Sequence, residues 1–431
     1  MPIGVIESLD YEARGITRQD GKTIFVEGAL PHEHVEYASF RKKSTYELAH
    51  LVNVLSPSAS RVTPQCPHFG VCGGCAMQHL EPGSQLAVKQ RVLEDTLWHI
   101  GRVRANEILP PIHGQPWAYR HRARLAVRKV SPTEVLIGFH ERRSSFIADI
   151  RSCEVLPPAA SQLLMPLRQL FSSLSVIDNL QQVDIAVGER CTTLLLRVLA
   201  PLSVRDEIQL RNFSDAHGIV FYLQPKGPDS VHLFYPKNAP ALSYALPEFG
   251  VEITFDPADF TQVNHEVNRV LVRRALHLLD PQPGERIADL FCGLGNFTLP
   301  IARLGARVMG IEGNPAMLRR ARESAQANGL GGQIEFSVAN LFQCTSASMG
   351  RLGHFDKMLI DPPREGAIEL IKAIGADAPR RIVYVSCNPA SLARDAACLV
   401  NDQGYRLLAL CAVNMFPQTA HVESISLFEK D

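Results

Sequence analysis

Hydrophobic and polar residues follow three different patterns along the chain, and these patterns predict three domains. Short β-type segments separated by turns fill residues 3–55, and Asp20-Gly21 between two of them is a strong hairpin signal. Helical and strand patterns are mixed in the next part, and from about residue 256 strands alternate with helices. We therefore predict domains over residues 1–58, 59–255 and 256–431.

The first region has the strand spacing of a small, five-stranded, OB-like β-barrel. Its basic turn, Arg41-Lys42-Lys43, has two interpretations. Charged loop tips are usually only solvated, but a small barrel with a basic loop is also a common format for binding RNA. We favour RNA binding for this domain, and we interpret residues 56–60 as a linker because they are rich in serine and proline.

The second region begins with a predicted helix over residues 83–100, in which apolar residues recur at helical spacing. Gly101 then has the position of a C-cap. Farther on, residues 119–128 are predicted as a strand that turns back at residues 131–133. One face of this strand is either solvated or a row of guanidinium groups for a phosphate backbone, and we favour the second interpretation. The face carries Arg120, Arg122, Arg124 and Arg128.

The third region has the alternating pattern of a doubly wound, Rossmann-like α/β fold, and residues 160–250 before it indicate a supporting α+β segment. One apolar, β-branched run at residues 382–385 predicts a fully buried parallel strand. The chain is expected to end in an antiparallel hairpin formed by residues 407–413 and 422–427.

Cys387 follows the buried run at residues 382–385 and precedes Asn388 and Pro389, which have the positions of an N-cap and a first helical residue. The cysteine is therefore expected at the carboxyl end of a strand, which is the sheet edge where ligands bind in open α/β folds. A nearby helix N-terminus also favours thiolate over thiol. The alternative is a small buried apolar cysteine, which is the common fate of a free thiol.

A glycine turn follows the strand predicted at residues 287–291 and contains Gly293 and Gly295. Glu312, about 20 residues farther on, ends the next predicted strand and suits a ribose hydroxyl pair. The third glycine of the dinucleotide pattern is missing. Turns of this kind bind S-adenosylmethionine as well as NAD, so the pattern leaves both cofactors open.

Composition restricts the function classes without choosing among them. The chain has 431 residues, a hydrophobic content of 46%, a charged content of 20% and a formal net charge of +0. Nucleic-acid binding must therefore come from local basic patches, since global charge does not predict it. No stretch is long and apolar enough to span a membrane, and no secretory signal is visible. Ten cysteines without such a signal indicate reduced thiols in the cytoplasm, with metal or catalytic uses.

Three cysteines lie close together in a glycine-rich stretch, Cys66, Cys72 and Cys75, with the spacing C-x5-C-x2-C. Glycines let backbone N–H groups approach sulfur closely, as iron–sulfur sites require. A fourth ligand is needed, and Cys153 is the best candidate. We favour a [4Fe-4S] cluster over zinc, because the paired x2 knuckles typical of zinc are absent. His68 and His79 are interpreted as ordinary polar residues.

Five motifs occur in a characteristic order: F-x-Q-x-N, D-L-F-C-G-x-G-N-F-T, D-P-P-R, S-C-N-P and H-V-E. With them the chain resembles the RNA uracil-C5 methyltransferases over essentially its whole length. The N-terminal barrel looks like a TRAM domain. With C-P-H-F-G-x-C-G-G-C added, the resemblance is strongest to the iron–sulfur branch that acts on 23S ribosomal RNA.

The resemblance implies roles for twelve residues. Cys387 would be the nucleophile, and Glu423 would be the base. The S-adenosylmethionine site would be lined by Gln262, Phe291, Asn296, Glu312, Asn340 and Asp361. The [4Fe-4S] cluster would be held by Cys66, Cys72, Cys75 and Cys153. Position 340 is Asn where many methyltransferases have Asp for the adenine amino group, and Cys292 in the cofactor turn is interpreted as a packing residue.

The implied reaction is methyl transfer from S-adenosylmethionine to C5 of one specific uridine in 23S ribosomal RNA. The cluster is expected to have a structural role, and the protein is expected to be a cytoplasmic monomer that binds a splayed RNA segment and no membrane. Alternatives are methylation of another ribosomal uridine or of transfer RNA, a cytosine-C5 methyltransferase, and an iron–sulfur RNA-binding module without catalysis.

Overall fold

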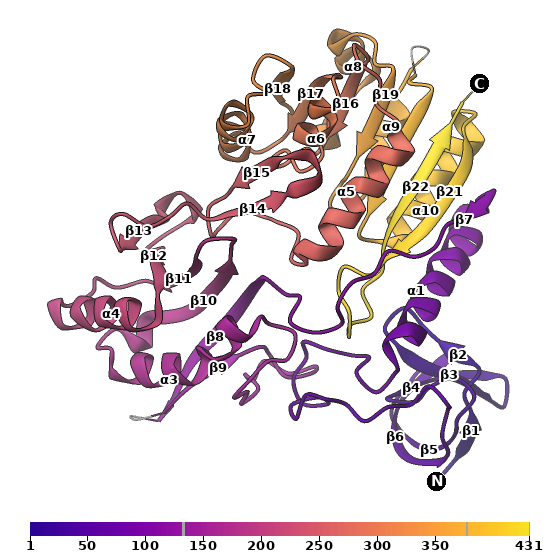
Figure 1. Ribbon diagram of the computed structural model, residues 1–431. Coiled ribbons are helices and arrows are strands. Elements are labelled where there is room, and N and C mark those ends of the chain that lie inside the picture. Colours follow the sequence, from indigo (N-terminus) through magenta and orange to yellow (C-terminus); the bar gives the residue numbers. More distant parts are fainter. Residues whose placement is uncertain (132–133, 376–377, 431) are drawn as a thin grey trace.

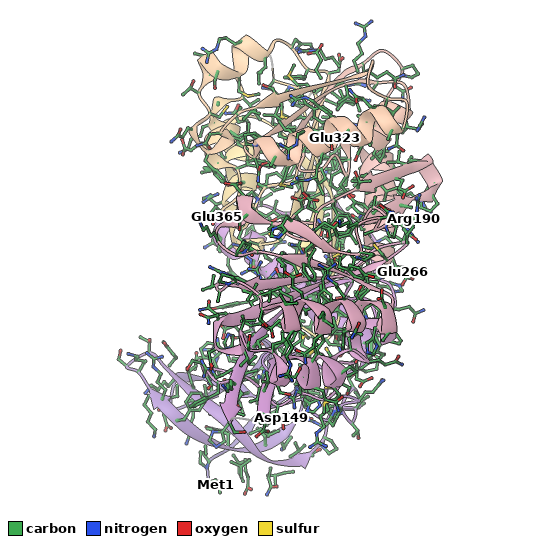
Figure 2. All side chains as sticks on the ribbon, turned by 90° about the vertical axis from the view of Figure 1, so that its left-hand side faces the viewer. Met1, Asp149, Arg190, Glu266, Glu323 and Glu365 are labelled. Atoms are coloured by element: carbon green, nitrogen blue, oxygen red, sulfur yellow. The ribbon has the colours of Figure 1, made fainter. Side chains whose placement is uncertain are left out.

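The computed structural model describes residues 1–131, 134–375 and 378–430. The turn predicted at residues 131–133 therefore lies mostly outside the described residues. The β-barrel, the central sheet and the large C-terminal sheet occupy three separate regions of the molecule (Figure 1). Met1 lies at one end of the molecule and Glu323 lies toward the other, with Asp149 and Glu266 between them (Figure 2).

The N-terminal sheet has six strands where the sequence predicted five, because the first segment splits into two short strands. β1 pairs with β5, and β2 pairs with β3 at the opposite edge of the sheet. Since β1 and β2 are consecutive in the chain, this pairing closes the sheet into a barrel around a small apolar core. The strands are β1 (Ile3–Val5), β2 (Ser8–Leu9), β3 (Arg14–Gln19), β4 (Lys22–Glu27), β5 (His34–Lys42) and β6 (Tyr46–Ser56).

The central region forms a second six-stranded sheet in the order β13-β12-β11-β10-β8-β9, as the mixed pattern suggested. Helices α3 and α4 contribute to its apolar core. Helix α4 was not predicted, although the Ser203–Asp206 capping box at its start was a usable signal. The elements are β8 (Arg122–Ser131), β9 (Glu134–Gly138), α2 (Pro158–Ser161), α3 (Leu164–Ser173), β10 (Leu180–Val187), β11 (Thr192–Val198), α4 (Val204–His217), β12 (Ile219–Leu223) and β13 (His232–Tyr235).

The arginine face predicted on this sheet is largely occupied by protein partners. Strand β8 begins at Arg122, so Arg120 precedes it. The Arg124 guanidinium pairs with Asp184 at 3.0 Å, and Arg122 donates to the carbonyl of Pro257 at 2.9 Å. Arg128 is exposed. Two members of the predicted phosphate-binding row are therefore bonded within the protein, although the Arg124 side chain remains 67% exposed.

The C-terminal sheet has eight strands in the order β18-β17-β16-β19-β20-β22-β21-β7. Helices cover both of its faces, as the predicted doubly wound fold requires (Figure 1). The elements are α5 (His265–Leu279), β16 (Arg286–Leu290), α6 (Thr298–Arg303), β17 (Arg307–Glu312), α7 (Pro315–Ala327), β18 (Ile334–Val338), α8 (Ser346–Leu352), β19 (Lys357–Ile360), α9 (Ile368–Ala373), β20 (Arg381–Ser386), α10 (Pro389–Ala397), β21 (Arg406–Val413) and β22 (Glu423–Glu429). The hairpin β14 (Ser243–Leu246) and β15 (Val251–Thr254) precedes them.

Strand β20 is fully buried, as predicted, but it is parallel only to β19. Its other neighbour is β22, which runs antiparallel because the final hairpin inserts its second strand between β20 and β21. This insertion brings the start of the last strand to the same edge as the end of β20.

Helix α1 (Pro82–Thr96) and β7 (Glu107–Ile108) precede the central sheet in the chain but associate with the C-terminal sheet. Strand β7 pairs in parallel with β21, and Leu93 and Leu97 join the core beneath α10. Gly101 is not the C-cap that was predicted. The left-handed residue is Arg102 (φ 53°), whereas Gly101 packs so closely on α10 that a Cβ atom would collide with the carbonyl of Ala393.

Candidate active site

Cys387 directly follows β20, at the carboxyl edge of the C-terminal sheet. The predicted N-cap is present, since Oδ1 of Asn388 accepts the backbone N–H of Ala390 at 3.0 Å and Pro389 begins α10. The amide nitrogen of Asn388 also donates to the carbonyl of Arg364 at 2.9 Å. These bonds fix the cysteine between a helix N-terminus and the loop that follows β19.

Glu423 begins β22 and lies beside Cys387, because Ser424 pairs with Ser386 in the antiparallel register. The Glu423 side chain is 6% exposed, and its Oε2 has no hydrogen-bond partner among the described residues. Burial raises the pKa of Glu423 to about 8, and the Asp361 carboxylate acts in the same direction. A buried carboxylate without a partner is costly, so burial favours the protonated form of Glu423. When Glu423 is ionised, its unpartnered Oε2 is free to accept a proton.

The expectation that the helix N-terminus keeps Cys387 as a thiolate is not met in the free protein. Burial raises the pKa of this thiol to about 12, and the negative charges of Glu423 and Asp361 add to the effect. Arg364 opposes them only partly. The thiol is therefore protonated at rest, and it must lose its proton as it attacks.

The loop after β19 supplies Asp361 and Arg364 to the same edge. Burial raises the pKa of Asp361 to about 7, with a contribution from Asp289. The Arg364 guanidinium lies 3.0 Å from Nε2 of His421, and this histidine precedes Glu423 by two residues. The loop thus brings one carboxyl and one cation against the cysteine and the glutamate.

The glycine turn after β16 has a left-handed backbone at three positions. Phe291, Gly293 and Gly295 have φ angles of 62°, 56° and 90°. The Glu312 carboxylate accepts the backbone N–H of Gly293 at 3.2 Å and that of Asn314 at 2.9 Å, so it is held against the turn. Each oxygen keeps acceptor capacity, which suits the two hydroxyl groups of a ribose.

The other residues predicted for this pocket differ in how their side chains are used. The Asn296 amide is bonded to Asn268 at 2.9 and 3.0 Å and accepts from Tyr244 at 3.1 Å, so its side chain braces the turn. Oδ1 of Asn340 accepts the backbone N–H of Phe342 at 3.1 Å. Gln262 is half-buried ahead of α5. The rings of Phe291 and Phe342 lie 5.5 Å apart and add an aromatic wall that the sequence did not indicate.

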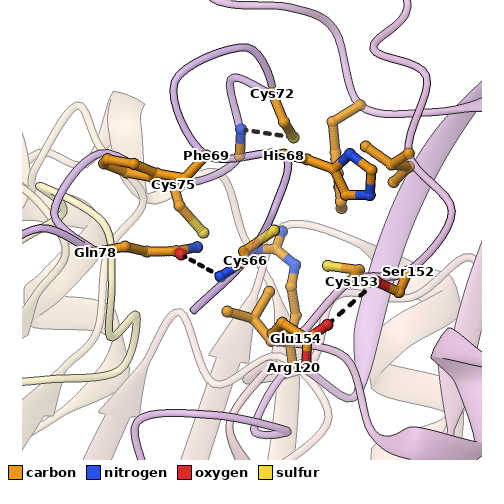
Figure 3. A pocket seen from close by; sticks show the side chains of 14 residues that line it. Cys66, His68, Phe69, Cys72, Cys75, Gln78, Arg120, Ser152, Cys153 and Glu154 are labelled. Atoms are coloured by element: carbon orange, nitrogen blue, oxygen red, sulfur yellow. Dashed lines mark hydrogen bonds between the residues drawn. The ribbon is translucent and has the colours of Figure 1, made fainter. Parts of the chain in front are cut away.

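Four cysteines line one cavity in the central region: Cys66, Cys72, Cys75 and Cys153. The side chains of Cys66, Cys75 and Cys153 converge on the same space (Figure 3). The sulfur of Cys72 accepts the backbone N–H of Gly74 at 3.4 Å, as expected for a glycine-rich sulfur loop. In the described part of the chain no group of three His, Cys, Asp or Glu side chains is gathered closely enough to hold a single metal ion.

Burial shapes the chemistry of this cavity. It raises the pKa of the Cys75 thiol to about 11 and that of Cys153 to about 12. Thiolates in such a place are stable only beside a strong positive charge, which is what bound metal supplies. His68 lines the same cavity, and its Nε2 accepts the backbone N–H of Arg151 at 3.1 Å. His79 is buried against Phe69, and neither ring nitrogen has a partner among the described residues.

The loop between β21 and β22 joins the cysteine loop to the sheet edge. The carbonyl of Gln418 accepts the backbone N–H groups of Ala76 and Met77 at 2.8 and 2.9 Å. The Tyr119 hydroxyl donates to the carbonyl of Pro417 at 2.8 Å. The residue after Cys75 therefore bonds directly to the segment that leads into Glu423.

Sequence reasoning missed the polar residues that hold this edge together. Gln85 and Lys89 are buried on α1, where helical periodicity had identified only the apolar positions. Asp289 is buried under the cofactor turn and accepts the Thr298 hydroxyl at 2.5 Å. The spacing of Gln85 and Lys89, four residues apart on one helix face, was the available signal.

Comparison with known proteins gives consistent relatives. The family described as tRNA (Uracil-5-)-methyltransferase matches residues 251–431. The 23S rRNA (uracil(1939)-C(5))-methyltransferase RlmD of Dechloromonas aromatica is 70% identical over 430 residues, which is 100% of both chains. The protein of the same name from Nitrosospira multiformis is 57% identical and covers 99% of this chain and 98% of its own.

A solved structure supports the fold. The Pyrococcus abyssi tRNA (uracil-54, C5)-methyltransferase, in complex with S-adenosyl-L-homocysteine, has a TM-score of 0.77 and covers 99% of both chains. Its sequence identity is 24%, so this likeness is one of fold. None of the helices in the described residues has the length and apolar character needed to cross a bilayer.

Proposed function

Because the chain belongs to the family of 23S rRNA (uracil(1939)-C(5))-methyltransferases, we propose that it methylates C5 of uridine 1939 in 23S ribosomal RNA with S-adenosylmethionine. One observation supports the roles of its residues above all. The antiparallel insertion of β22 brings Glu423 beside Cys387, at the edge that also carries the glycine turn. A thiol, a buried carboxyl and a cofactor turn at one sheet edge are the groups this chemistry needs.

Cys387 and Glu423 act at different steps of the proposed reaction. Uracil C5 is a weak nucleophile, so the Cys387 sulfur attacks C6 as its thiol proton leaves to water, and electron density moves onto C5. S-adenosylmethionine supplies the electrophilic methyl group. Glu423 then takes the C5 proton, the C5=C6 double bond forms again, and the bond from C6 to the Cys387 sulfur breaks. The target base must be unstacked to reach this edge, which costs roughly a few kcal/mol.

We assign the methyl donor to the glycine turn. Glu312 is held toward the turn by two backbone bonds and suits the ribose hydroxyls. Phe291 and Phe342 would flank the adenine, with Asn340 near its edge. Asp361 and Gln262 would complete the site near the reacting edge, and Asn296 would act by bracing the turn.

A [4Fe-4S] cluster held by Cys66, Cys72, Cys75 and Cys153 is part of this proposal. The four side chains line one cavity without forming a single-ion site. Four thiolates on one zinc, each about 2.3 Å from it, would be packed far more tightly. The bonds from Ala76 and Met77 to Gln418 favour a structural role, in which the cluster loop supports the active-site loop.

RNA binding is assigned to the barrel and the central region, with the three predicted domains kept as functional units. The barrel, proposed as a TRAM domain, has exposed basic residues at the end of β5, namely Arg41, Lys42 and the following Lys43. Beside it, the Arg143 guanidinium stacks 4.9 Å from the ring of Phe40. Cations and exposed aromatic rings suit a splayed RNA segment. We propose a cytoplasmic monomer that binds such a segment.

The test is methylation in vitro. The protein is incubated with 23S ribosomal RNA and S-adenosylmethionine labelled in its methyl group, and the labelled nucleotide is mapped. We expect label on C5 of uridine 1939. Cys387→Ala should abolish transfer while S-adenosylhomocysteine still binds. Label on cytosine, on another uridine or on none contradicts the proposal, and activity retained by Cys387→Ala would move the nucleophile elsewhere.

A further inference from the structure

Lys89 is a buried charge with no part in the reaction described above. It lies on the inner face of α1 and is 1% exposed. Its Nζ donates to Oδ1 of Asn414 at 2.7 Å and to the carbonyl of Phe416 at 2.8 Å. Burying an ammonium group is costly unless acceptors and an opposite charge compensate it, so its position calls for a physical reason.

The acceptors of Lys89 lie in the loop that leads into Glu423. Asn414 follows Val413, and Val413 is the partner of Glu423 in the β21–β22 register. Lys89 therefore bonds to the residue next to Val413, which lies opposite the base. An ammonium group has three donors, and two of them are used by Asn414 and Phe416.

Glu423 is subject to few positive charges. Arg364 and Lys89 both favour its ionised form. Arg364 is exposed, so water and salt screen its charge, whereas Lys89 and Glu423 are both buried. The unpartnered Oε2 of Glu423 is buried as well. Of the two cations, Lys89 is therefore the one whose charge acts on the Glu423 carboxylate without screening by water.

We propose that Lys89 is a positioning residue for proton abstraction, which holds the loop at residues 414–416 and stabilises the Glu423 carboxylate that receives the C5 proton. The inference rests on the proposed function and deepens it. The C5–H bond breaks and the proton moves to a carboxylate oxygen of Glu423. The electron pair forms the C5=C6 double bond as the bond from C6 to sulfur breaks, so the step needs no other reactant.

The electrostatics agree with this geometry. Burial lowers the pKa of Lys89 to about 7, and the Glu423 charge opposes this effect, so each group favours the charged form of the other. The charges of Lys89 and Arg364 in turn lower the pKa of Glu423 against the larger effect of burial. The titratable or charged groups around the pair lie after β19, after β20, in the β21–β22 loop and in the segment before β8. They are Asp361, Arg364, Cys387, His421 and Arg120.

Gln85 provides a matched control on the same helix. It is buried four residues before Lys89 and bonds to the same loop. Its amide donates to Oε1 of Gln418 at 3.0 Å, and its oxygen accepts the backbone N–H of Gln418 at 3.0 Å. Gln85 supports the loop without carrying a charge, so its removal separates loop support from electrostatics.

The experiment compares Lys89→Met, Lys89→Gln and Gln85→Leu with the wild type in single turnovers. The probes are a 23S ribosomal RNA fragment containing uridine 1939 and methyl-labelled S-adenosylmethionine. Covalent protein–RNA adduct and released methylated RNA are measured on denaturing gels from pH 6 to 9.5. S-adenosylhomocysteine binding confirms the folded state, and Lys89→Gln can still donate to Asn414 if Lys89→Met does not fold.

We expect both Lys89 variants to accumulate adduct at pH 7 and to release it at higher pH. The pH range over which release increases should move upward by about one pH unit, as expected when a buried carboxyl loses an unscreened opposite charge. Gln85→Leu should lower the rate of RNA release by the same factor at every pH. If Lys89→Gln, or both Lys89 variants, release RNA with the pH dependence of the wild type, the inference is wrong. A wild type that does not methylate the uridine refutes the proposed function instead.

Discussion

At the scale of single residues, burial decides which proton states the active site can use. The Glu423 carboxyl and the Cys387 thiol both have raised pKa values, about 8 and about 12. Burial is the main cause, and repulsion from neighbouring negative charges adds to it. One of the two groups must give up a proton for the attack on C6, and the other must later accept one. At neutral pH both groups are therefore mostly protonated, and the fraction of Glu423 that can act as a base increases as the pH approaches 8.

Glu423→Gln should stop the reaction after methyl transfer. An amide cannot take the C5 proton, so the Cys387–uracil adduct should accumulate and turnover should fall by about 10²–10⁴-fold. In the wild type, release should increase with pH up to about 8 and then level off, since the base must be deprotonated. Denaturing gels with labelled RNA measure both effects.

Glu429→Gln is the matched control, because Glu429 is the last residue of the same strand and pairs with Arg381 far from the active edge. It should turn over like the wild type. Normal turnover by Glu423→Gln, or release independent of pH between 6 and 8, would contradict the role of Glu423.

At the scale of elements, close packing of α1 on α10 supports the active edge. Gly101, in the last turn after α1, is pressed against the backbone of α10, and α10 begins beside Cys387. Farther along α1, Lys89 and Gln85 reach the loop between β21 and β22. One helix thus contacts the elements that carry both proposed catalytic groups.

Gly101→Ala should destabilise this packing. The new methyl group would collide with the carbonyl of Ala393, which is backbone and cannot rotate away. Overpacking of this kind costs about 1–3 kcal/mol, which urea unfolding measures. Gly332→Ala is the control, because nothing lies within 4 Å of the added Cβ, and its effect should stay within about 0.5 kcal/mol. Equal stability of the two variants would contradict the packing described.

At the scale of the whole molecule, the cysteine cavity and the sheet edge are joined by direct backbone bonds. Ala76 and Met77 follow Cys75 and donate to Gln418 in the active-site loop. Met77 also packs with Leu9 and Leu30 of the barrel region. The cysteine loop therefore contacts both the barrel region and the active-site loop.

Removing the proposed cluster should loosen the active-site loop. Chelation of iron should bleach a broad visible absorption near roughly 400 nm. Hydrogen exchange should then increase over residues 66–80 and 414–421, because the cysteine loop loses its anchor. Cofactor binding at the glycine turn should persist.

Cys153→Ser should reproduce the effect of chelation, and Cys344→Ser, outside the cavity, should not. A colourless protein, or an active-site loop with unchanged exchange after bleaching, would show that the cluster does not support this loop.

Local signals in the sequence were sufficient for much of the fold. The β-branched run of β20, the Asn388–Pro389 start of α10 and the alternating pattern of the C-terminal sheet all act within a few residues, so short windows reveal them. The motif order also indicated the family. Gly101 shows the limit of such signals, because a glycine after a helix marks either a cap or a close contact.

The sequence by itself determined the periods, the caps and the residue types of the chemistry. Only the tertiary structure decided which polar residues are buried together. Lys89 and Asn414 are 325 positions apart, and Gln85 bonds to Gln418 across 333 positions. Burial energies depend on such long-range pairs, since a charge is tolerated inside only where its partners converge. For the same reason, the antiparallel insertion of β22 that brings Glu423 to Cys387 is a property of the assembled sheet.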